Sequence, residues 1–138
     1  MSTLSLNENI MGLGHMGLPT LDMDATIKFY RFWGFSIIHS KINAGNKVNF
    51  IRKGNCIIET YEDQAAVKAW GAIQHIALNV QCADEAFPLV KAICEREGYK
   101  MIDDHVMALP FWDKGIRYFN IEGPNHEVVE FCEIVNNK

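Results

Sequence analysis

The stretch GLGHMGLPTLDMDATIKFYRFWGFSII at residues 12–38 decides the fold, because a second stretch of the chain repeats its pattern. The second stretch is AIQHIALNVQCADEAFPLVKAICEREGYKMI at residues 72–102. Each predicts a short apolar strand with one histidine, an amphipathic helix led by aspartate, and a glycine followed by an aromatic residue. His15 in the first copy corresponds to His75 in the second. The pattern indicates an internal duplication.

The sequence that follows each copy is also repeated. VNFIRKGNCIIET at residues 48–60 matches RYFNIEGPNHEVVEF at residues 117–131, which sets Glu59 against Glu130. The separation between corresponding residues grows from 60 at the histidines to 71 at the glutamates, and Gly54 matches Gly123 at an intermediate separation of 69. Small insertions in loops explain this drift.

Local signals predict the order β-α-β-β-β in two modules, at about 11–61 and 72–134. Asp22 or Asp24 is expected to cap the first helix, and Asp84 the second. Short β-rich segments bounded by glycine, asparagine or proline lie at 47–52, 56–61, 115–121 and 127–134. Because about 60 residues bury little core, we expect the modules to pack together or to swap with a partner. The expected fold class is α+β.

Composition limits the functional classes. The 138 residues carry a net charge of −4 and 49% hydrophobic residues, which suits a single globular domain over 1–138. Clustered lysine and arginine, which a nucleic-acid surface needs, are missing, and no apolar run approaches the ~18 residues of a membrane span. With no basic region followed by an apolar one at the start, we expect a cytoplasmic protein. The four cysteines form no C-x-x-C pair and are interpreted as small hydrophobic residues.

The repeat places four chemically active side chains at equivalent positions: His15, Glu59, His75 and Glu130. Both glutamates stand in otherwise apolar runs, IIET and VVEF, where an ionised carboxylate is costly unless it is paired or binds a metal. One histidine in a strand is usually a satisfied core or edge residue. The matched occurrence in both copies instead favours a divalent metal site, which mixed nitrogen and oxygen ligands suit.

These residues resemble the vicinal oxygen chelate superfamily, and within it the short type of glyoxalase I. The motifs that carry the resemblance are GHMGLPTLDMDATIKFYRFWGF, CIIETYE, QHIALNV and EGPNHEVVEF. The resemblance implies paired βαβββ modules that form an incomplete barrel around a metal, with His15, Glu59, His75 and Glu130 as its ligands. It also implies a homodimer, in some members with each site shared between two chains.

The activity implied is that of a metal-dependent lyase or isomerase similar to lactoylglutathione lyase. A divalent ion (Ni, Zn, Co or Mn) would stabilise an ene-diolate while a proton moves alpha to a carbonyl, with Glu130 as the base and Glu59 as the alternative base. Methylmalonyl-CoA epimerase-like and Fe(II) dioxygenase activities remain alternatives, as does a binding module of the same fold. A fourth ligand favours the lyase similar to lactoylglutathione lyase and the methylmalonyl-CoA epimerase-like enzyme. Extradiol dioxygenases and fosfomycin-modifying transferases of the superfamily typically use three protein ligands.

Two features depart from the family pattern. Glutathione-using members place an arginine shortly after the first histidine, whereas no arginine lies between His15 and Arg31, which argues against glutathione as part of the substrate. The segment 103–114, DDHVMALPFWDK, has no counterpart in the first module. It predicts either a wall of the substrate pocket or a packed surface loop with a buried tryptophan.

Overall fold

The computed structural model describes residues 4–9, 11, 13, 15–71 and 73–136. The first residues of the two repeated stretches, Gly12 and Ala72, lie outside these ranges. The first half contains α1 (Leu6–Asn9), β1 (Met16–Thr20), α2 (Met23–Arg31), β2 (Ser36–Asn43), β3 (Asn46–Lys53) and β4 (Cys56–Glu62). The second contains β5 (His75–Asn79), α3 (Ala83–Glu97), β6 (Lys100–Met101), β7 (Met107–Leu109), β8 (Ile116–Glu122) and β9 (Val128–Ile134).

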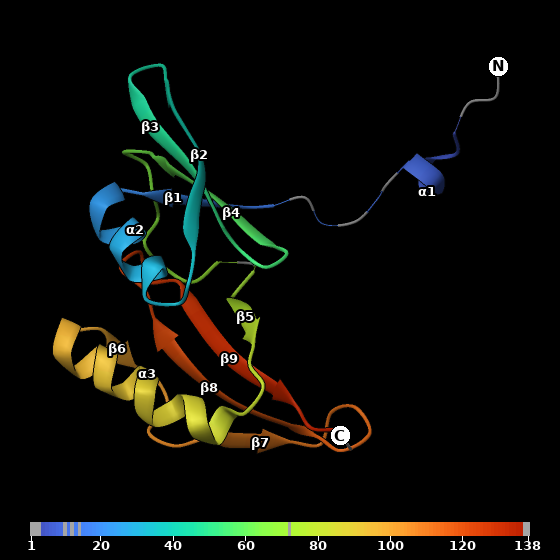
Figure 1. Ribbon diagram of the computed structural model, residues 1–138. Helices are drawn as coiled ribbons and strands as arrows, with labels where there is room; N and C mark the ends of the chain where they lie inside the picture. The colour runs from blue at the N-terminus through green and yellow to red at the C-terminus, as the bar shows by residue number, and fades with distance from the viewer. Residues whose placement is uncertain (1–3, 10, 12, 14, 72, 137–138) are drawn as a thin grey trace.

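Each half of the chain forms its own mixed sheet (Figure 1). The strand order is β1-β4-β3-β2 in the first sheet and β5-β9-β8-β6 in the second, where β7 also pairs with β8. In both sheets the opening strand runs parallel to the closing strand, and the other pairs are antiparallel. The described strands do not close into a barrel. The predicted α+β class with two related modules is confirmed.

The second module departs from the βαβββ order because one strand position is interrupted. In the first module the long strand β2 pairs with β3 along its whole length. In the second, β6 and β7 share the corresponding place beside β8, pairing with its end and its beginning respectively. The break between them contains Asp103, whose side chain contacts the middle of β8.

Helix α2 begins and ends where the sequence predicts. The Asp22 carboxylate accepts a hydrogen bond of 3.0 Å from the backbone N–H of Ala25, which confirms the expected cap. Three residues after the helix, Gly34 has a φ of +89°, a conformation that favours glycine and turns the chain into β2. In the second module, the left-handed Gly98 ends α3 in the same way, with a φ of 79°.

The cap predicted for α3 is wrong. Asp84 lies inside the first turn, and the N-cap residue is Cys82, whose side chain makes no capping hydrogen bond. The backbone N–H of Ala83 instead donates to Oε1 of Glu133 in β9 at 2.9 Å. Asp84 accepts a hydrogen bond from Arg117 of β8. Because the capping acceptor comes from a strand about fifty residues away, local sequence could not identify it.

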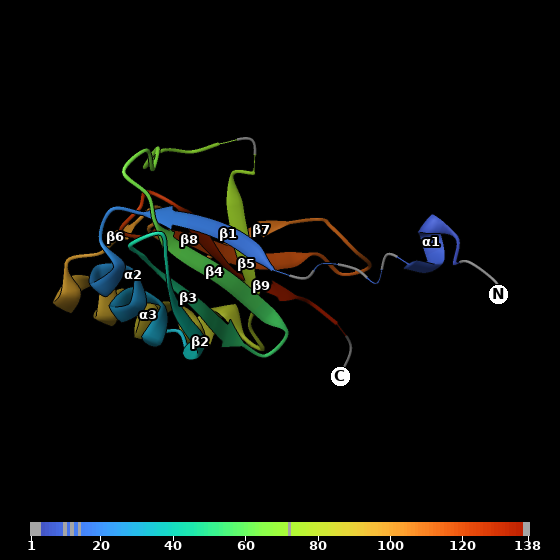
Figure 2. The same ribbon diagram turned by 90° about the horizontal axis from the view of Figure 1, so that it is seen from above.

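The core lies between the sheets and the two long helices, α2 and α3, which cover the same side of both sheets (Figures 1 and 2). Aromatic rings join the modules there. The Trp33 ring meets Phe131 edge-on with centroids 5.3 Å apart, and the Phe29 ring meets Tyr99 with centroids 4.9 Å apart. The halves therefore share one hydrophobic core. None of the helices within the described ranges is long and apolar enough to cross a membrane.

A largely buried polar network also links α2 to the turn before β9. Asn125 donates from Nδ2 to Oγ1 of Thr26 at 2.9 Å and to Oε2 of Glu127 at 3.2 Å. The Tyr30 hydroxyl donates to the same Glu127 oxygen at 3.1 Å. Burial, together with the neighbouring Glu127 carboxylate, raises the pKa of Tyr30 well above its usual value. This network holds α2 against the turn that leads into β9, the strand that carries Glu130.

Candidate metal centre

The first half-site lies where β1 and β4 run side by side. His15 immediately precedes β1, and Gly17, two residues later, is the parallel partner of Glu59 in β4. Side chains alternate between the faces of a strand, so Glu59 points away from the core in which its neighbour Ile58 is fully buried. Nε2 of His15 lies 3.3 Å from Oε1 of Glu59, and the two side chains are 46% and 31% exposed. Imidazole and carboxylate therefore meet on the open face of the first sheet.

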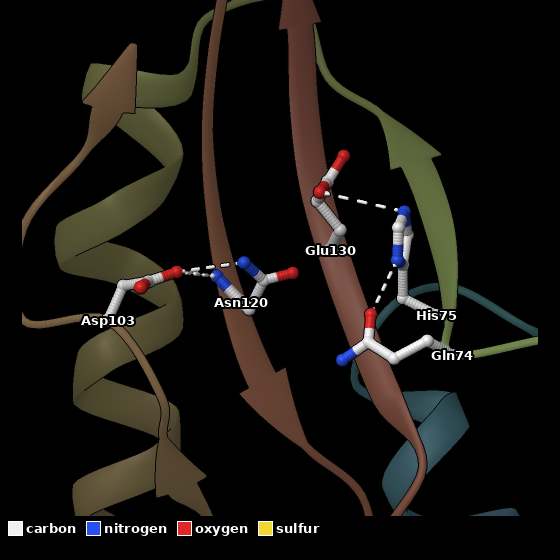
Figure 3. Close-up of polar contacts among 5 residues, drawn as sticks. All are labelled: Gln74, His75, Asp103, Asn120 and Glu130. Atoms are coloured by element: carbon white, nitrogen blue, oxygen red, sulfur yellow. Dashed lines mark hydrogen bonds and ion pairs between the residues drawn. The ribbon is translucent and has the colours of Figure 1, made fainter. Parts of the chain in front are cut away.

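The second half-site is built in the same way from β5 and β9. His75 opens β5, and Ala77, two residues later, is the parallel partner of Glu130. Nε2 of His75 lies 3.9 Å from Oε1 of Glu130, with the two side chains 45% and 14% exposed (Figure 3). The four predicted site residues thus form two His–Glu pairs, one on the open face of each sheet.

Gln74 orients the imidazole of His75. Its side-chain oxygen Oε1 lies 2.7 Å from Nδ1 of His75 (Figure 3). A carbonyl oxygen only accepts hydrogen bonds, so Nδ1 carries the proton, and in the neutral ring Nε2 keeps its lone pair. That lone pair lies on the Glu130 side, the arrangement in which imidazoles usually bind metals. Sequence analysis did not single out Gln74, although its place directly before His75 was a usable signal.

Within each His–Glu pair, the distance between the two donor atoms can be compared with the spacing of ligands around one divalent ion. Ligands held about 2.1 Å from one ion at octahedral or tetrahedral angles are roughly 3 to 3.4 Å apart. The His15–Glu59 separation of 3.3 Å matches this spacing, and the His75–Glu130 separation of 3.9 Å exceeds it by the amount that a small rotamer change would remove. In the part of the chain that the structure describes, no third histidine, cysteine, aspartate or glutamate joins either pair. Within one chain, each pair therefore offers two donors to an ion.

Three of the cysteines have thiols with a raised pKa. Cys132 lies on the same strand face as Glu130, and burial together with the negative charge of Glu130 raises the pKa of its thiol. Burial also raises the pKa of Cys56 and brings that of Cys94 to about 11. All four cysteines are free. The three thiols with raised pKa values are therefore protonated near neutral pH when no metal ion is bound.

The strand neighbours of the two glutamates differ in chemistry. Glu59 lies opposite Phe50 of β3, whose ring meets the His15 ring edge-on with centroids 5.4 Å apart. Glu130 lies opposite Asn120 of β8. One half-site is therefore bordered by an aromatic ring and the other by an amide.

Comparison of the two copies in sequence concealed Asn120. Matching Gly54 with Gly123 sets Phe50 against Phe119, but the turn between β3 and β4 has two residues and the turn between β8 and β9 has five. The strand register sets Phe50 against Asn120 instead. A shift of one residue moves a side chain to the other face of a sheet. The sequence match therefore pairs Phe50 with Phe119, which is buried in the core, and not with Asn120, which lies opposite Glu130.

A groove of about 680 Å³ adjoins the first half-site on the open face, lined among others by Gly17, Val48, Glu59 and Tyr61. A cavity of this size accepts a small organic molecule. The segment 103–114 is not a packed loop with a buried tryptophan, because Trp112 is 73% exposed. Its contact with the second half-site runs through Asp103, which binds Asn120.

Comparison with known proteins finds similarity both in sequence and in fold. No protein-family model matches the chain. The chain is 32% identical over 128 residues to YwbC of Bacillus subtilis (strain 168), an uncharacterized protein, in an alignment that covers 88% of the chain and 96% of YwbC.

Two solved structures illustrate the shared fold. The fosfomycin resistance protein FosX from Listeria monocytogenes, crystallised with Mn(II) and a sulfate ion, has a TM-score of 0.71 at 18% identity, over 91% of this chain and 94% of FosX. A glyoxalase family protein from Enterococcus faecalis has a TM-score of 0.69 at 14% identity, over 91% and 99% of the two chains. At identities this low, the TM-scores establish a common fold and nothing further.

Proposed function

We propose that this chain, which belongs to one family with YwbC and has the fold of FosX and of a glyoxalase family protein, is a metal-dependent, glyoxalase I-like lyase or isomerase of the vicinal oxygen chelate superfamily. One observation carries the proposal. A histidine and a glutamate stand at the same register in both sheets, on the face away from the core. The chemistry of these side chains suits a divalent ion, and FosX is a protein of this fold crystallised with Mn(II).

The halves of the site meet across a homodimer in this proposal. Each chain holds two His–Glu pairs, and each pair lies on a face that is open to solvent. A two-fold axis that places the first pair of one chain beside the second pair of its partner creates two equal four-ligand sites. The ligands of each site would then be His15 and Glu59 of one chain with His75 and Glu130 of the other.

The residues of the chain divide the work of the reaction. A divalent ion such as Ni, Zn, Co or Mn would act as a Lewis acid toward the substrate carbonyl. Glu130 would take a proton from the neighbouring carbon on a carboxylate oxygen and return it to an adjacent atom of the substrate. Its side chain is 14% exposed against 31% for Glu59, so a proton held there exchanges less readily with bulk water. Glu59 would face the substrate from the opposite side.

Metal content tests this proposal directly. The native protein is compared by elemental mass spectrometry with Glu59→Ala, and with Glu95→Ala, an exposed glutamate on α3, as a control. We expect near-stoichiometric Ni, Zn, Co or Mn in the native protein and in the control, and its loss in Glu59→Ala. The loaded protein is then assayed with hemithioacetals and with acyl-CoA epimers.

Two other results would contradict the proposal. Stoichiometric iron that Glu59→Ala leaves unchanged would indicate a three-ligand site and the Fe(II) dioxygenase alternative. A native protein that binds none of these metals would refute the enzyme proposal while leaving the fold assignment in place.

A further inference from the structure

Asn120 lies directly opposite Glu130 on the neighbouring strand. Its backbone C=O accepts a hydrogen bond from Ile102 at 2.9 Å, and its backbone N–H donates to Oδ2 of Asp103 at 2.8 Å. Both backbone groups therefore point away from β9. In an antiparallel ladder this makes Asn120 and Glu130 a non-hydrogen-bonded pair, in which the Cα atoms approach to about 4.5 Å and the side chains lie closest together.

The amide of Asn120 is held in one orientation. Nδ2 donates to the same Asp103 oxygen at 2.9 Å, so one carboxylate oxygen binds both the backbone and the side-chain N–H of this residue. A carboxylate accepts but does not donate, which fixes the amide nitrogen on the Asp103 side. Figure 3 shows the amide oxygen on the opposite side, toward Glu130.

The amide oxygen has no donor among the described residues. Glu130, the nearest functional group on that side, offers only acceptors when it is ionised. A carbonyl oxygen beside a carboxylate is satisfied by an O–H or N–H that enters between them. Water supplies such a donor in the free protein, and a bound molecule can replace it.

We propose that Asn120 is a substrate-contacting residue that accepts a hydrogen bond from a hydroxyl group next to the reacting carbon, and that Asp103 is the positioning residue that aims it. The inference rests on the proposed function, because it places the substrate beside Glu130. It also narrows the substrate class to hydroxyl-bearing carbonyl compounds, such as hemithioacetals, over acyl thioesters that carry no donor beside the reacting carbon.

The other half-site supports an asymmetric substrate. At the register position of Asn120, the first sheet has Phe50, which offers an apolar ring and no acceptor. A substrate held between the halves would direct its hydroxyl toward Asn120 and an apolar group toward Phe50. Because only the Asn120 side offers a hydrogen-bond acceptor, the site would distinguish the two faces of the substrate.

Calorimetric titration of the Mn(II)-loaded protein with lactate and with propionate tests the inference. The two probes differ in one hydroxyl group, so the ratio of their Kd values reports what that hydroxyl contributes. We compare this ratio in the native protein, in Asn120→Ala and in Asp103→Ala. The matched control is Asn49→Ala, an asparagine of β3 whose side chain lies on the helix-covered face of the first sheet, opposite to the face of Phe50 and Glu59.

We expect Asn120→Ala to reduce the preference for lactate by about fivefold, the usual effect of one neutral hydrogen bond, with the affinity for propionate unchanged. Asp103→Ala should lose much of the same preference, because the amide is then free to turn. Asn49→Ala should keep it. Unchanged propionate binding would show that the variants are folded and hold the metal.

An equal preference for lactate in native protein and Asn120→Ala would overturn the inference while leaving the metal site in place, because the hydroxyl would then bind elsewhere. Failure of the native protein to bind Mn(II), Ni, Zn or Co would instead refute the proposed function, and the inference with it.

Discussion

Glu59 and Glu130 occupy the same place in two different sheets: each lies opposite the residue two positions after a histidine, across a pair of parallel strands. Duplication of one module therefore reproduced one His–Glu pair. Two ligands are too few for the four- or six-coordinate ions that such donors bind. The pairs stand on separate open faces, and in the proposed homodimer the first pair of one chain would meet the second pair of its partner.

Variants that each lack one half-site should complement each other. His15→Ala and His75→Ala are expected to be inactive alone, because every site of either homodimer lacks a histidine. A heterodimer contains one site with both substitutions and one with neither. After denaturation and refolding together, the mixture should recover roughly a quarter of the native activity and metal content, since half of the dimers are mixed and each has one intact site.

The control is the same mixture made from two variants of one half-site, His15→Ala and Glu59→Ala. Each site of that heterodimer lacks one residue of its first half, so no activity should return. Equal recovery in both mixtures, or none in either when heterodimers are detected by native mass spectrometry, would contradict a shared site.

Glu130→Gln should separate proton transfer from folding. Glutamine has the same shape and keeps an oxygen that can accept hydrogen bonds, so we expect an unchanged fold and part of the metal content. It cannot take up a proton, so kcat should fall by about 10² to 10⁴ while KM changes little. The measurement is steady-state kinetics at matched metal occupancy. A kcat within a factor of a few of the native value would exclude Glu130 as the base.

Tyr30 should make stability depend on alkaline pH. Its raised pKa means that native Tyr30 keeps its proton above pH 10, where an unfolded tyrosine loses it. The unfolded state then binds fewer protons than the native state, so this contribution to stability is full below pH 10 and declines as the pH rises further. Tyr30→Phe loses the hydrogen bond to Glu127 and should be less stable by about 1 to 2 kcal/mol at pH 7.

The difference in unfolding free energy between native protein and Tyr30→Phe, measured in urea, should be constant from pH 6 to 9 and shrink above pH 10. Taking this difference cancels the titration of the other groups. A difference that stays constant up to pH 11 would contradict the buried, protonated hydroxyl.

Sequence was sufficient to predict two related α+β modules and most of their strand segments, and it set His15 and Glu59 against His75 and Glu130. These features depend on local patterns: strand alternation around Glu59 and Glu130, the cap at Asp22, and the glycine that ends α3. The strand patterns and the glycines that follow the helices recur in both copies, so each copy supports the prediction made for the other.

The features that sequence could not predict are those set by distant residues. The cap of α3 comes from Glu133 and not from Asp84, because the strand beside the helix places an acceptor there. Asn120 was concealed by unequal turn lengths, and its orientation depends on Asp103, which occupies an interruption in the neighbouring strand. The two His–Glu pairs lie on different sheets, and the order of the four residues along the chain does not show how far apart the two sheets place them.

The shared core predicts that the modules unfold together. Phe29 is fully buried, and its ring contacts Tyr30, Trp33 and Tyr99, the last from the second module. Phe29→Ala should reduce the unfolding free energy by about 3 to 5 kcal/mol, through lost burial and the cavity that remains. Phe111→Ala, which changes a ring 54% exposed on the surface, should alter it by less than about 0.5 kcal/mol.

Urea unfolding followed by circular dichroism and by tryptophan fluorescence measures both variants. Because Phe29 packs against Tyr99 of the second module, we expect one transition with coincident midpoints, shifted to lower urea in Phe29→Ala. Two separate transitions, with only the first module destabilised, would show that each module is stable by itself. That result would also weaken the expectation that the half-sites are held in fixed positions within a chain, since the core that α2 and α3 share is what joins the two sheets.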